Sequence, residues 1–103
     1  MKKLGWSNHA RKDLDEIFNF YFKKNPTVAA RIHDSIIDEA QRLIKWSEIG
    51  KVEHLLDSYN FEFQFRSLVT KDGLFKIIYF VDNDMIVISR IWSCRKNPMN
   101  LRP

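Results

Sequence analysis

Three runs rich in apolar, aromatic and β-branched residues follow one another closely in the second half of the chain. They span residues 61–66, 74–81 and 85–92, and only short polar segments separate them. Asp72-Gly73 lies between the first two runs and Asp82-Asn83-Asp84 between the last two. Asp, Asn and Gly tolerate the positive φ of tight turns, so the pattern predicts three consecutive antiparallel strands.

The three runs differ in how their apolar residues are spaced. Residues 61–66 alternate phenylalanine with a polar side chain, which predicts a strand with one buried face. Residues 74–81 are apolar at almost every position, which is typical of a central strand covered on both faces. We therefore expect a sheet that presents basic residues between apolar ones.

Two amphipathic segments precede these runs. Ser7 is expected to cap the first helix, and Asn25-Pro26 opens the second, because Asn is a favoured N-cap and Pro a favoured first helical residue. Apolar residues recur at helical spacing in both segments, at Ala10, Leu14, Ile17 and Tyr21 in the first and at Ala29, Ile32, Ile36, Ala40 and Leu43 in the second. The second helix is expected to run to about Trp46 or Ser47, and Gly50 is expected to end it.

Together these elements predict an α+β fold. Two helices joined by so short a turn fold back as a hairpin, and their apolar faces require a partner layer. We expect the N-terminal helical hairpin to pack on one face of a twisted antiparallel sheet of about four strands, with residues 2–6 as an edge strand and residues 57–60 as a turn. The 103 residues are expected to form a single domain, residues 1–103.

The composition narrows the class of protein. Hydrophobic residues make up 45% of the chain, enough for a sizeable core, and the formal charge of +4 favours an acidic partner, either nucleic acid or an acidic protein. A basic surface that only keeps the protein in solution is the alternative. The single Cys94 excludes an intramolecular disulfide. Neither a signal-peptide pattern nor an apolar run of membrane-spanning length is present, so we expect a cytoplasmic protein without membrane contact.

Most chemical motifs are missing from the sequence. It has no Gly-rich phosphate loop, and its three histidines do not lie at the spacing of metal ligands, so neither a metal nor another cofactor is expected. Basic residues gather near both ends of the chain, at Lys2, Lys3, Arg11, Lys12, Arg90, Arg95, Lys96 and Arg102. If the first and last strands are neighbours, these residues form one basic region.

Several short motifs accompany the predicted elements in a fixed order. They are Asp13-Leu14-Asp15-Glu16-Ile17, Glu53-His54-Leu55, Phe65-Arg66-Ser67-Leu68-Val69, Phe75-Lys76-Ile77-Ile78-Tyr79-Phe80-Val81 and Arg95-Lys96-Asn97-Pro98. In order and spacing the chain resembles, over essentially its full length, the RelE/ParE superfamily of toxins from type II toxin–antitoxin systems, also labelled plasmid-stabilisation proteins.

The resemblance implies a toxin that inhibits growth and that a cognate acidic antitoxin neutralises in a toxin–antitoxin hetero-oligomer. ParE-like members poison DNA gyrase and are not known for a catalytic site, whereas RelE-like members cut messenger RNA at the ribosome. Arg95, Pro98 and Leu101 resemble the C-terminal Arg-x-x-Pro-x-x-Leu of ParE-like sequences, so the chain is closer to ParE. A RelE- or YoeB-like ribosome-dependent mRNA endonuclease is the alternative, and a decayed toxin that survives as a binding module is a third possibility.

The RelE-like set of catalytic residues is mostly missing. That set uses Lys and Arg to hold the scissile phosphate and a terminal Tyr or His to move protons. Met99 stands where this Tyr would be, and Lys76 stands at the position of a catalytic Arg. The stretch Gly50-Lys51-Val52-Glu53-His54-Leu55 resembles the one in which YoeB-like relatives carry a catalytic Glu. Under the nuclease alternative Glu53 is the candidate base and Lys76 the phosphate clamp; otherwise Glu53 is a connector residue that pairs with a nearby cation.

Whether the chain is an enzyme therefore depends on which of the two activities it has. Under the ParE-like interpretation the chain needs no catalytic residue, whereas under the RelE-like interpretation the chain is a ribonuclease. The candidate contacts to a target or partner are Arg66, Lys76, Arg90, Arg95 and Lys96. For Arg66 and Arg95 the alternative is a structural role, as the partner of a carboxylate or of the backbone within the chain.

Overall fold

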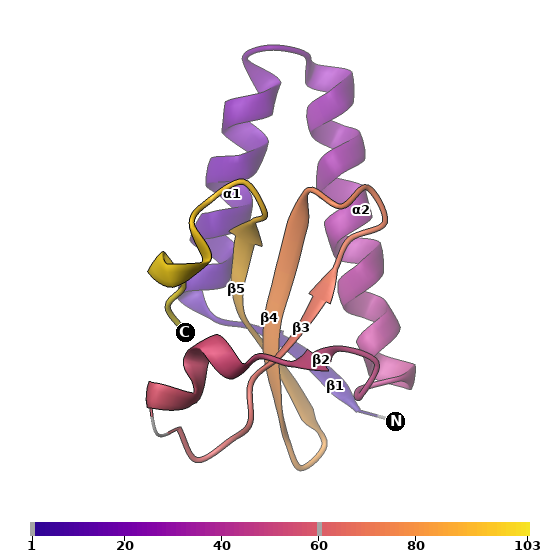
Figure 1. Cartoon of the computed structure of the whole chain (residues 1–103). Coiled ribbons are helices and arrows are strands. Elements are labelled where there is room, and N and C mark those ends of the chain that lie inside the picture. Colours follow the sequence, from indigo (N-terminus) through magenta and orange to yellow (C-terminus); the bar gives the residue numbers. More distant parts are fainter. Residues whose placement is uncertain (1, 60) are drawn as a thin grey trace.

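The computed structural model describes residues 2–59 and 61–103 (Figure 1). In chain order, its elements are β1 (Lys3–Trp6), α1 (Asn8–Phe22), α2 (Pro26–Lys45), β2 (Lys51–Val52), the 3-10 helix η1 (His54–Tyr59), β3 (Arg66–Val69), β4 (Phe75–Asp82), β5 (Met85–Ser93) and the 3-10 helix η2 (Pro98–Asn100). The helical hairpin packs on one face of the sheet, so the predicted α+β arrangement is confirmed. No helix among the described residues is long and apolar enough to cross a membrane.

The sheet has the strand order β1-β5-β4-β3-β2. Strands β3, β4 and β5 form the predicted antiparallel meander with β4 at its centre. Strand β1 is the expected edge strand and runs parallel to β5, so the first and last strands are indeed neighbours. The sheet has five strands rather than about four, because β2 pairs with the start of β3 within a segment that we expected to be a connector.

The first predicted strand is wrong in its position. The alternating pattern predicts a strand over residues 61–66, but β3 begins only at Arg66. The rings of Phe61, Phe63 and Phe65 gather around Phe80, at centroid distances of 6.3, 5.1 and 5.6 Å. An extended chain would hold Phe61 and Phe65 roughly 13 Å apart, whereas their ring centroids are 5.0 Å apart. Burial of the phenyl groups against one ring therefore bends this segment away from strand geometry.

Both predicted hairpin turns are present. Gly73 has a φ of 74° and Asn83 a φ of 54°, which is the left-handed region that these two residue types enter most easily. These turns fix the register of β3, β4 and β5, since one residue more or less would move every side chain to the other face. The turn expected at residues 57–60 is instead the end of η1 as far as Tyr59, and Asn60 lies outside the described residues.

The helix ends follow the predicted capping residues. The Ser7 hydroxyl oxygen accepts a hydrogen bond from the N–H of Ala10 at 3.0 Å. The side chain of Asn25 caps α2 in the same way, with Pro26 as the first helical residue and Trp46 as the C-cap. Both helices therefore begin at signals that the local sequence carries.

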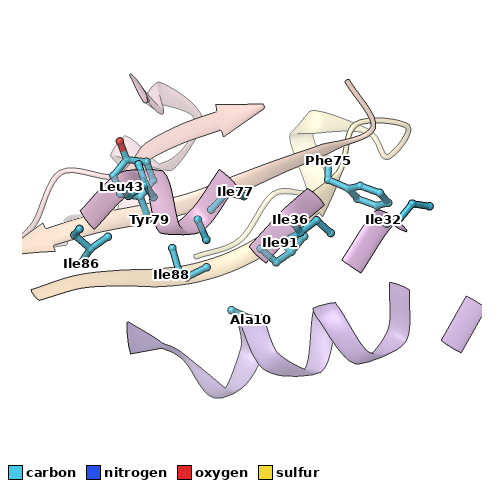
Figure 2. Packing of buried hydrophobic residues seen from close by; sticks show 11 residues of the cluster. Ala10, Ile32, Ile36, Leu43, Phe75, Ile77, Tyr79, Ile86, Ile88 and Ile91 are labelled. Carbon is cyan, nitrogen blue, oxygen red and sulfur yellow. The ribbon is translucent and has the colours of Figure 1, made fainter. Parts of the chain in front are cut away.

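The main core lies between the helical hairpin and the sheet (Figure 2). Its buried members are Ala10, Ile32, Ile36, Ala40, Leu43, Phe75, Ile77, Tyr79, Ile86, Ile88 and Ile91. The stripe predicted for α2 is buried at every position, and full burial of a side chain such as Ile36 contributes about 2 kcal/mol. The apolar periodicity of the sequence thus identified the helix face that packs on the sheet.

A second, smaller cluster covers the opposite face of the sheet. It consists of Leu56 from η1, Phe65, Ile78 from β4, Trp92 from β5 and Leu101 from the C-terminal segment. Strand β4 is therefore covered on both faces, as its continuous apolar run predicts. The C-terminal residues are part of the fold, because Leu101 is only 2% exposed.

Tyr79 ties the segment after α2 to the centre of the sheet. Its hydroxyl donates to the carbonyl of Ser47 and accepts from the N–H of Gly50, both at 2.9 Å. Burial raises the pKa of this phenol, although the Gly50 hydrogen bond and the Arg66 charge act in the opposite direction. The raised pKa means that the phenol stabilises the fold in its neutral form below pH 10, and this contribution is lost as the pH rises through the folded-state pKa.

Replacing Gly50 with alanine should destabilise the protein. A Cβ at this position would lie 2.5 Å from the Tyr79 hydroxyl and 2.8 Å from the carbonyl oxygen of Ser67, so the side chain or the backbone must move. We expect Gly50→Ala to lower the free energy of unfolding by about 3 kcal/mol, measured by urea denaturation. Gly5→Ala is the control, because its Cβ would meet only Met85 Sδ at 3.4 Å and Ile86 O at 4.0 Å. Equal losses in the two variants would contradict this account.

Candidate partner-binding site

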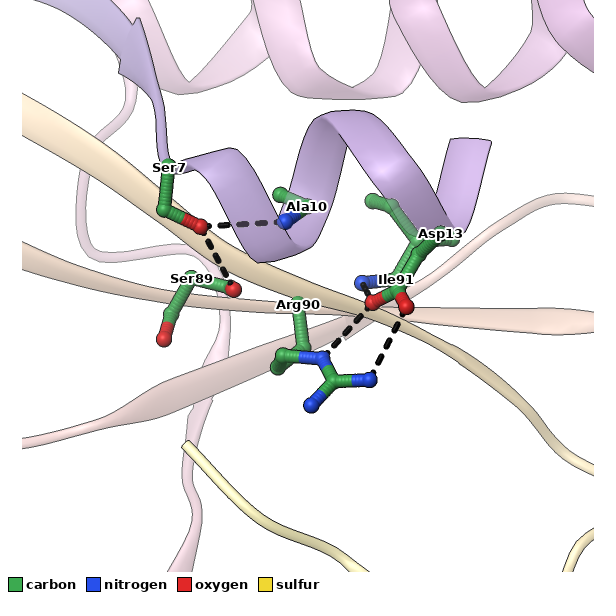
Figure 3. Close-up of polar contacts among 6 residues, drawn as sticks. All are labelled: Ser7, Ala10, Asp13, Ser89, Arg90 and Ile91. Carbon is green, nitrogen blue, oxygen red and sulfur yellow. Dashed lines mark hydrogen bonds and ion pairs between the residues drawn. The ribbon is translucent and has the colours of Figure 1, made fainter. Parts of the chain in front are cut away.

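Helix α1 continues the edge of the sheet where β1 stops. Strand β1 pairs with β5 only as far as Trp6 and Ile88. Beyond that point Ser7 donates its N–H to the Ile88 carbonyl at 2.9 Å. Its hydroxyl donates to the Ser89 carbonyl at 2.8 Å (Figure 3). The residue that caps α1 therefore also satisfies the backbone of β5, which anchors the start of the helix to the strand.

Asp13 fastens the next turn of α1 to the same strand (Figure 3). Its Oδ2 accepts hydrogen bonds from Arg90 Nε at 2.7 Å and from the N–H of Ile91 at 3.0 Å, while its Oδ1 accepts from Arg90 Nη2 at 2.9 Å. The two contacts to the guanidinium form a bidentate pair, the strongest arrangement for these groups. The hydrogen bonds that Arg90 donates to the Asp13 carboxylate raise the pKa of Arg90 further above its already high value.

A bulge in β5 accompanies this contact. Ile78 pairs with Arg90 and the next residue, Tyr79, pairs with Ile88, so Ser89 has no partner residue on β4. An extra residue of this kind bends a strand and redirects the side chains beside it. The bulge lets both Ile88 and Ile91 face the helices, and it lies directly beside the Arg90 that meets Asp13.

Two of the predicted contact residues use their charges within the chain. Arg90 pairs with Asp13. Arg66 donates to the carbonyl of Gly50 at 2.9 Å and, more weakly, to that of Glu48 at 3.5 Å, so it holds the segment that follows α2. The geometry therefore gives both arginines a positioning role in the fold.

The two residues named for the nuclease alternative lie together. Lys76 Nζ is 3.2 Å from Glu53 Oε2, and the two side chains are 22% and 8% exposed. The pairing of Glu53 with a nearby cation is the arrangement that the connector interpretation anticipates. Each charge is thus balanced by the other on the face of the sheet opposite the helical hairpin.

Arg95 and Lys96 differ from the other candidates because both are exposed. They follow β5, and none of the ion pairs found among residues 2–59 and 61–103 involves either of them. They border a groove of about 310 Å³ between α1 and the end of β5. The apolar side chains that line this groove are Ile17, Phe20, Tyr21, Phe75 and Ile91, and the remaining lining residues are Asp13, Glu16 and Ser93.

This groove has the features of a peptide-binding surface. Its floor is aromatic and aliphatic, and two cations with no ion-pair partner among the described residues stand on one rim. Along a strand, successive backbone N–H groups point alternately to the two sides. The N–H of Ser93 therefore points to the outer edge of β5, as does the N–H of Ile91, which already donates to Asp13. An extended or helical segment with apolar and acidic side chains fits this combination.

The sequence carried a signal for part of this site that we did not use. Asp13 follows Ala10 by three residues and precedes Ile17 by four, so an acid lies within the apolar stripe of α1. Charged residues are almost never buried unless they are paired, so this position predicts an ion-pair partner on the sheet. Phe20 is the second overlooked residue: it lies outside the stripe, on the exposed side of an amphipathic helix, where a large apolar side chain indicates a contact surface.

Removing the Asp13 carboxylate should destabilise the protein strongly. Asp13→Ala leaves the Arg90 guanidinium and the Ile91 N–H without their partner, so we expect a loss of about 3–5 kcal/mol in the free energy of unfolding. Chemical denaturation of Asp13→Ala and of Asp15→Ala provides the measurement. Asp15 is exposed on the same helix, and its replacement should change stability by less than about 0.5 kcal/mol. A similar small effect at Asp13 would refute the anchoring role.

Comparison with known proteins agrees with this architecture. The chain matches the family described as the ParE toxin of the type II toxin–antitoxin system parDE over residues 4–98. A solved chain from the chromosomal ParDE toxin–antitoxin system of P. aeruginosa has a similar fold, with a TM-score of 0.74 and 23% sequence identity over 90% of this chain and 96% of that chain. No curated protein matches the sequence. Because the family match covers nearly all of it, the chain belongs to the ParE toxin family of type II toxin–antitoxin systems.

Proposed function

We propose that this ParE-family toxin acts by binding DNA gyrase in the cytoplasm and that a cognate acidic antitoxin holds it inactive. The observation that carries the proposal is the Glu53–Lys76 pair, in which the two residues best suited to catalysis neutralise each other. Arg95 and Lys96, which are exposed and belong to no ion pair among the described residues, lie elsewhere, beside the groove between α1 and β5. A toxin whose free charges border a groove, and whose candidate catalytic charges are paired, is suited to binding.

The paired carboxylate is poorly placed to be a general base. A base must reach the proton that it abstracts, within about 2.6–3.2 Å, and Glu53 is only 8% exposed and already contacts Lys76. A phosphate clamp needs an unbalanced positive charge, and that of Lys76 is balanced. Met99, at the position of the terminal tyrosine, is 73% exposed and has no proton to transfer.

The mRNA endonuclease remains the second candidate for one reason. Glu53 and Lys76, which lie 23 residues apart in the sequence, meet on one face of the sheet. A substrate phosphate that displaced Glu53 from Lys76 would leave a base and a cation next to each other. The nuclease alternative therefore depends on two named residues, and substitution of both residues tests it.

Removing this pair separates the two functions. We expect Glu53→Gln/Lys76→Met to arrest growth like the wild type when expressed without antitoxin, and to inhibit gyrase supercoiling within about threefold of wild type. The double substitution leaves neither charge unpaired, so its effect on stability should be small. A nuclease that lost its base would be slower by about 10² to 10⁴-fold. Loss of growth arrest in a folded double variant, together with loss of messenger cleavage at the ribosome, would replace gyrase binding with the nuclease function.

The antitoxin is proposed to occupy the groove between α1 and β5. A segment with apolar side chains can contact Ile17 and Tyr21, while its carboxylates meet Arg95 and Lys96. Charge complementarity of this kind speeds association and selects the acidic partner over others. Such a complex is the hetero-oligomer expected of a type II pair.

Reversing the charges on the groove rim should weaken the antitoxin complex. We expect Arg95→Glu/Lys96→Glu to raise the Kd for the acidic protein encoded beside the toxin gene by about 10- to 100-fold, because like charges then face one another. Titration calorimetry at low salt measures this change. The control is Lys51→Glu/Lys71→Glu, which alters two exposed lysines outside the groove and changes the net charge equally. Equal weakening in both variants would show that only overall charge matters.

A further inference from the structure

The helical hairpin ends in a basic tip. The turn between α1 and α2 lies beyond the end of the sheet, so the last turns of α1 and the first of α2 project from the body of the protein (Figure 1). Residues 17–33 contain no Asp or Glu and carry Lys23, Lys24 and Arg31. The projecting end of the hairpin is therefore purely cationic.

The same tip exposes large aromatic side chains. Phe20 is 54% exposed and Phe22 is 49% exposed. Their orientation is supported from within the tip, since Lys24 Nζ lies 4.4 Å from the centroid of the Phe20 ring and the Phe22 and Phe18 ring centroids are 5.6 Å apart. Exposed rings flanked by cations indicate a contact surface, because aromatic residues are enriched in the buried core of protein interfaces.

The chemistry of the tip defines the partner that fits it. The rings require apolar side chains opposite them, and the cations require carboxylates around those side chains. A nucleic acid would need a row of cations along its backbone, whereas the tip combines three cations with two exposed rings. An acidic protein surface with apolar side chains at its centre satisfies both requirements.

We propose that the hairpin tip is the surface with which this toxin contacts its protein target, at an acidic patch that carries apolar side chains. The inference rests on the proposed function, in which the target is gyrase, and adds the location and chemistry of the contact. Phe20 belongs both to the tip and to the lining of the groove between α1 and β5. An antitoxin segment in that groove covers a ring that the target needs, so antitoxin and target compete for Phe20.

The test uses two variants that are matched in exposure and charge. Phe22→Ser/Lys24→Glu alters two residues of the tip that do not themselves line the groove, although Lys24 contacts the ring of Phe20, which does. Phe61→Ser/Lys45→Glu is the control, and Phe61 is 52% exposed on a different part of the surface. Lys45 Nζ lies 5.0 Å from the centroid of the Trp46 ring, so it contacts an aromatic ring as Lys24 does, whose Nζ is 4.4 Å from the Phe20 centroid. Reconstituted gyrase is the probe, with binding measured on a biosensor surface. We expect gyrase binding to weaken by about thirtyfold or more in the tip variant and by less than about threefold in the control.

The outcomes separate this inference from the proposed function. If the wild-type toxin does not bind gyrase, both fall. If it binds and the tip variant binds equally well, only the location at the tip is refuted. If the tip variant instead loses binding to duplex DNA, to anionic vesicles or to a second copy of the chain while gyrase binding stays unchanged, the tip belongs to that other partner. Should Phe22→Ser/Lys24→Glu melt early, Lys23→Glu/Arg31→Glu tests the same surface through charges that are fully exposed.

Discussion

The anchoring of α1 to the outer edge of β5 is the contact on which the rest of the structure depends. A four-residue β1 covers only part of that edge, and an open edge with unpaired backbone groups is unstable and prone to pairing with other chains. Asp13 closes the next part of the edge with a bidentate ion pair and a backbone hydrogen bond. This contact sets the distance between helix and strand, and therefore the width of the groove and the direction in which the hairpin projects.

The cationic side chains of this small domain divide into those that hold the fold together and those that remain on the surface. Arg90, Arg66 and Lys76 fasten helix, connector and sheet to one another, and each meets a carboxylate or carbonyl of the chain. Cations that have no such partner among the described residues include Lys23 at the hairpin tip and Arg95 beside the groove. At the hairpin tip and beside the groove, positive charge therefore lies next to exposed aromatic rings, an arrangement that suits the binding of an acidic protein.

Local signals in the sequence were sufficient for much of the fold. The caps Ser7 and Asn25, the stripe of α2 and the turns at Gly73 and Asn83 depend on a few neighbouring residues, and all were predicted correctly. The strand predicted at residues 61–66 failed because its phenylalanines pack on Phe80, a contact between distant segments. The cations of the site were identified by type, but their partners depend on topology: only the strand order shows that Arg90 reaches Asp13, 77 residues away.

Neutralisation of a binding toxin poses a different physical problem from inhibition of an enzyme. Under the proposed function no reactive group has to be blocked, so the antitoxin is expected to compete with the target for contact area. Phe20 lies where the groove meets the tip, and one ring cannot be buried against two partners at once. In the proposed complex the antitoxin gains affinity from the whole groove and its basic rim while it withholds a single ring from the target. On this proposal, release of the toxin requires only that the antitoxin leave the groove, because the Asp13 contacts anchor α1, and with it the tip, to β5 without any partner.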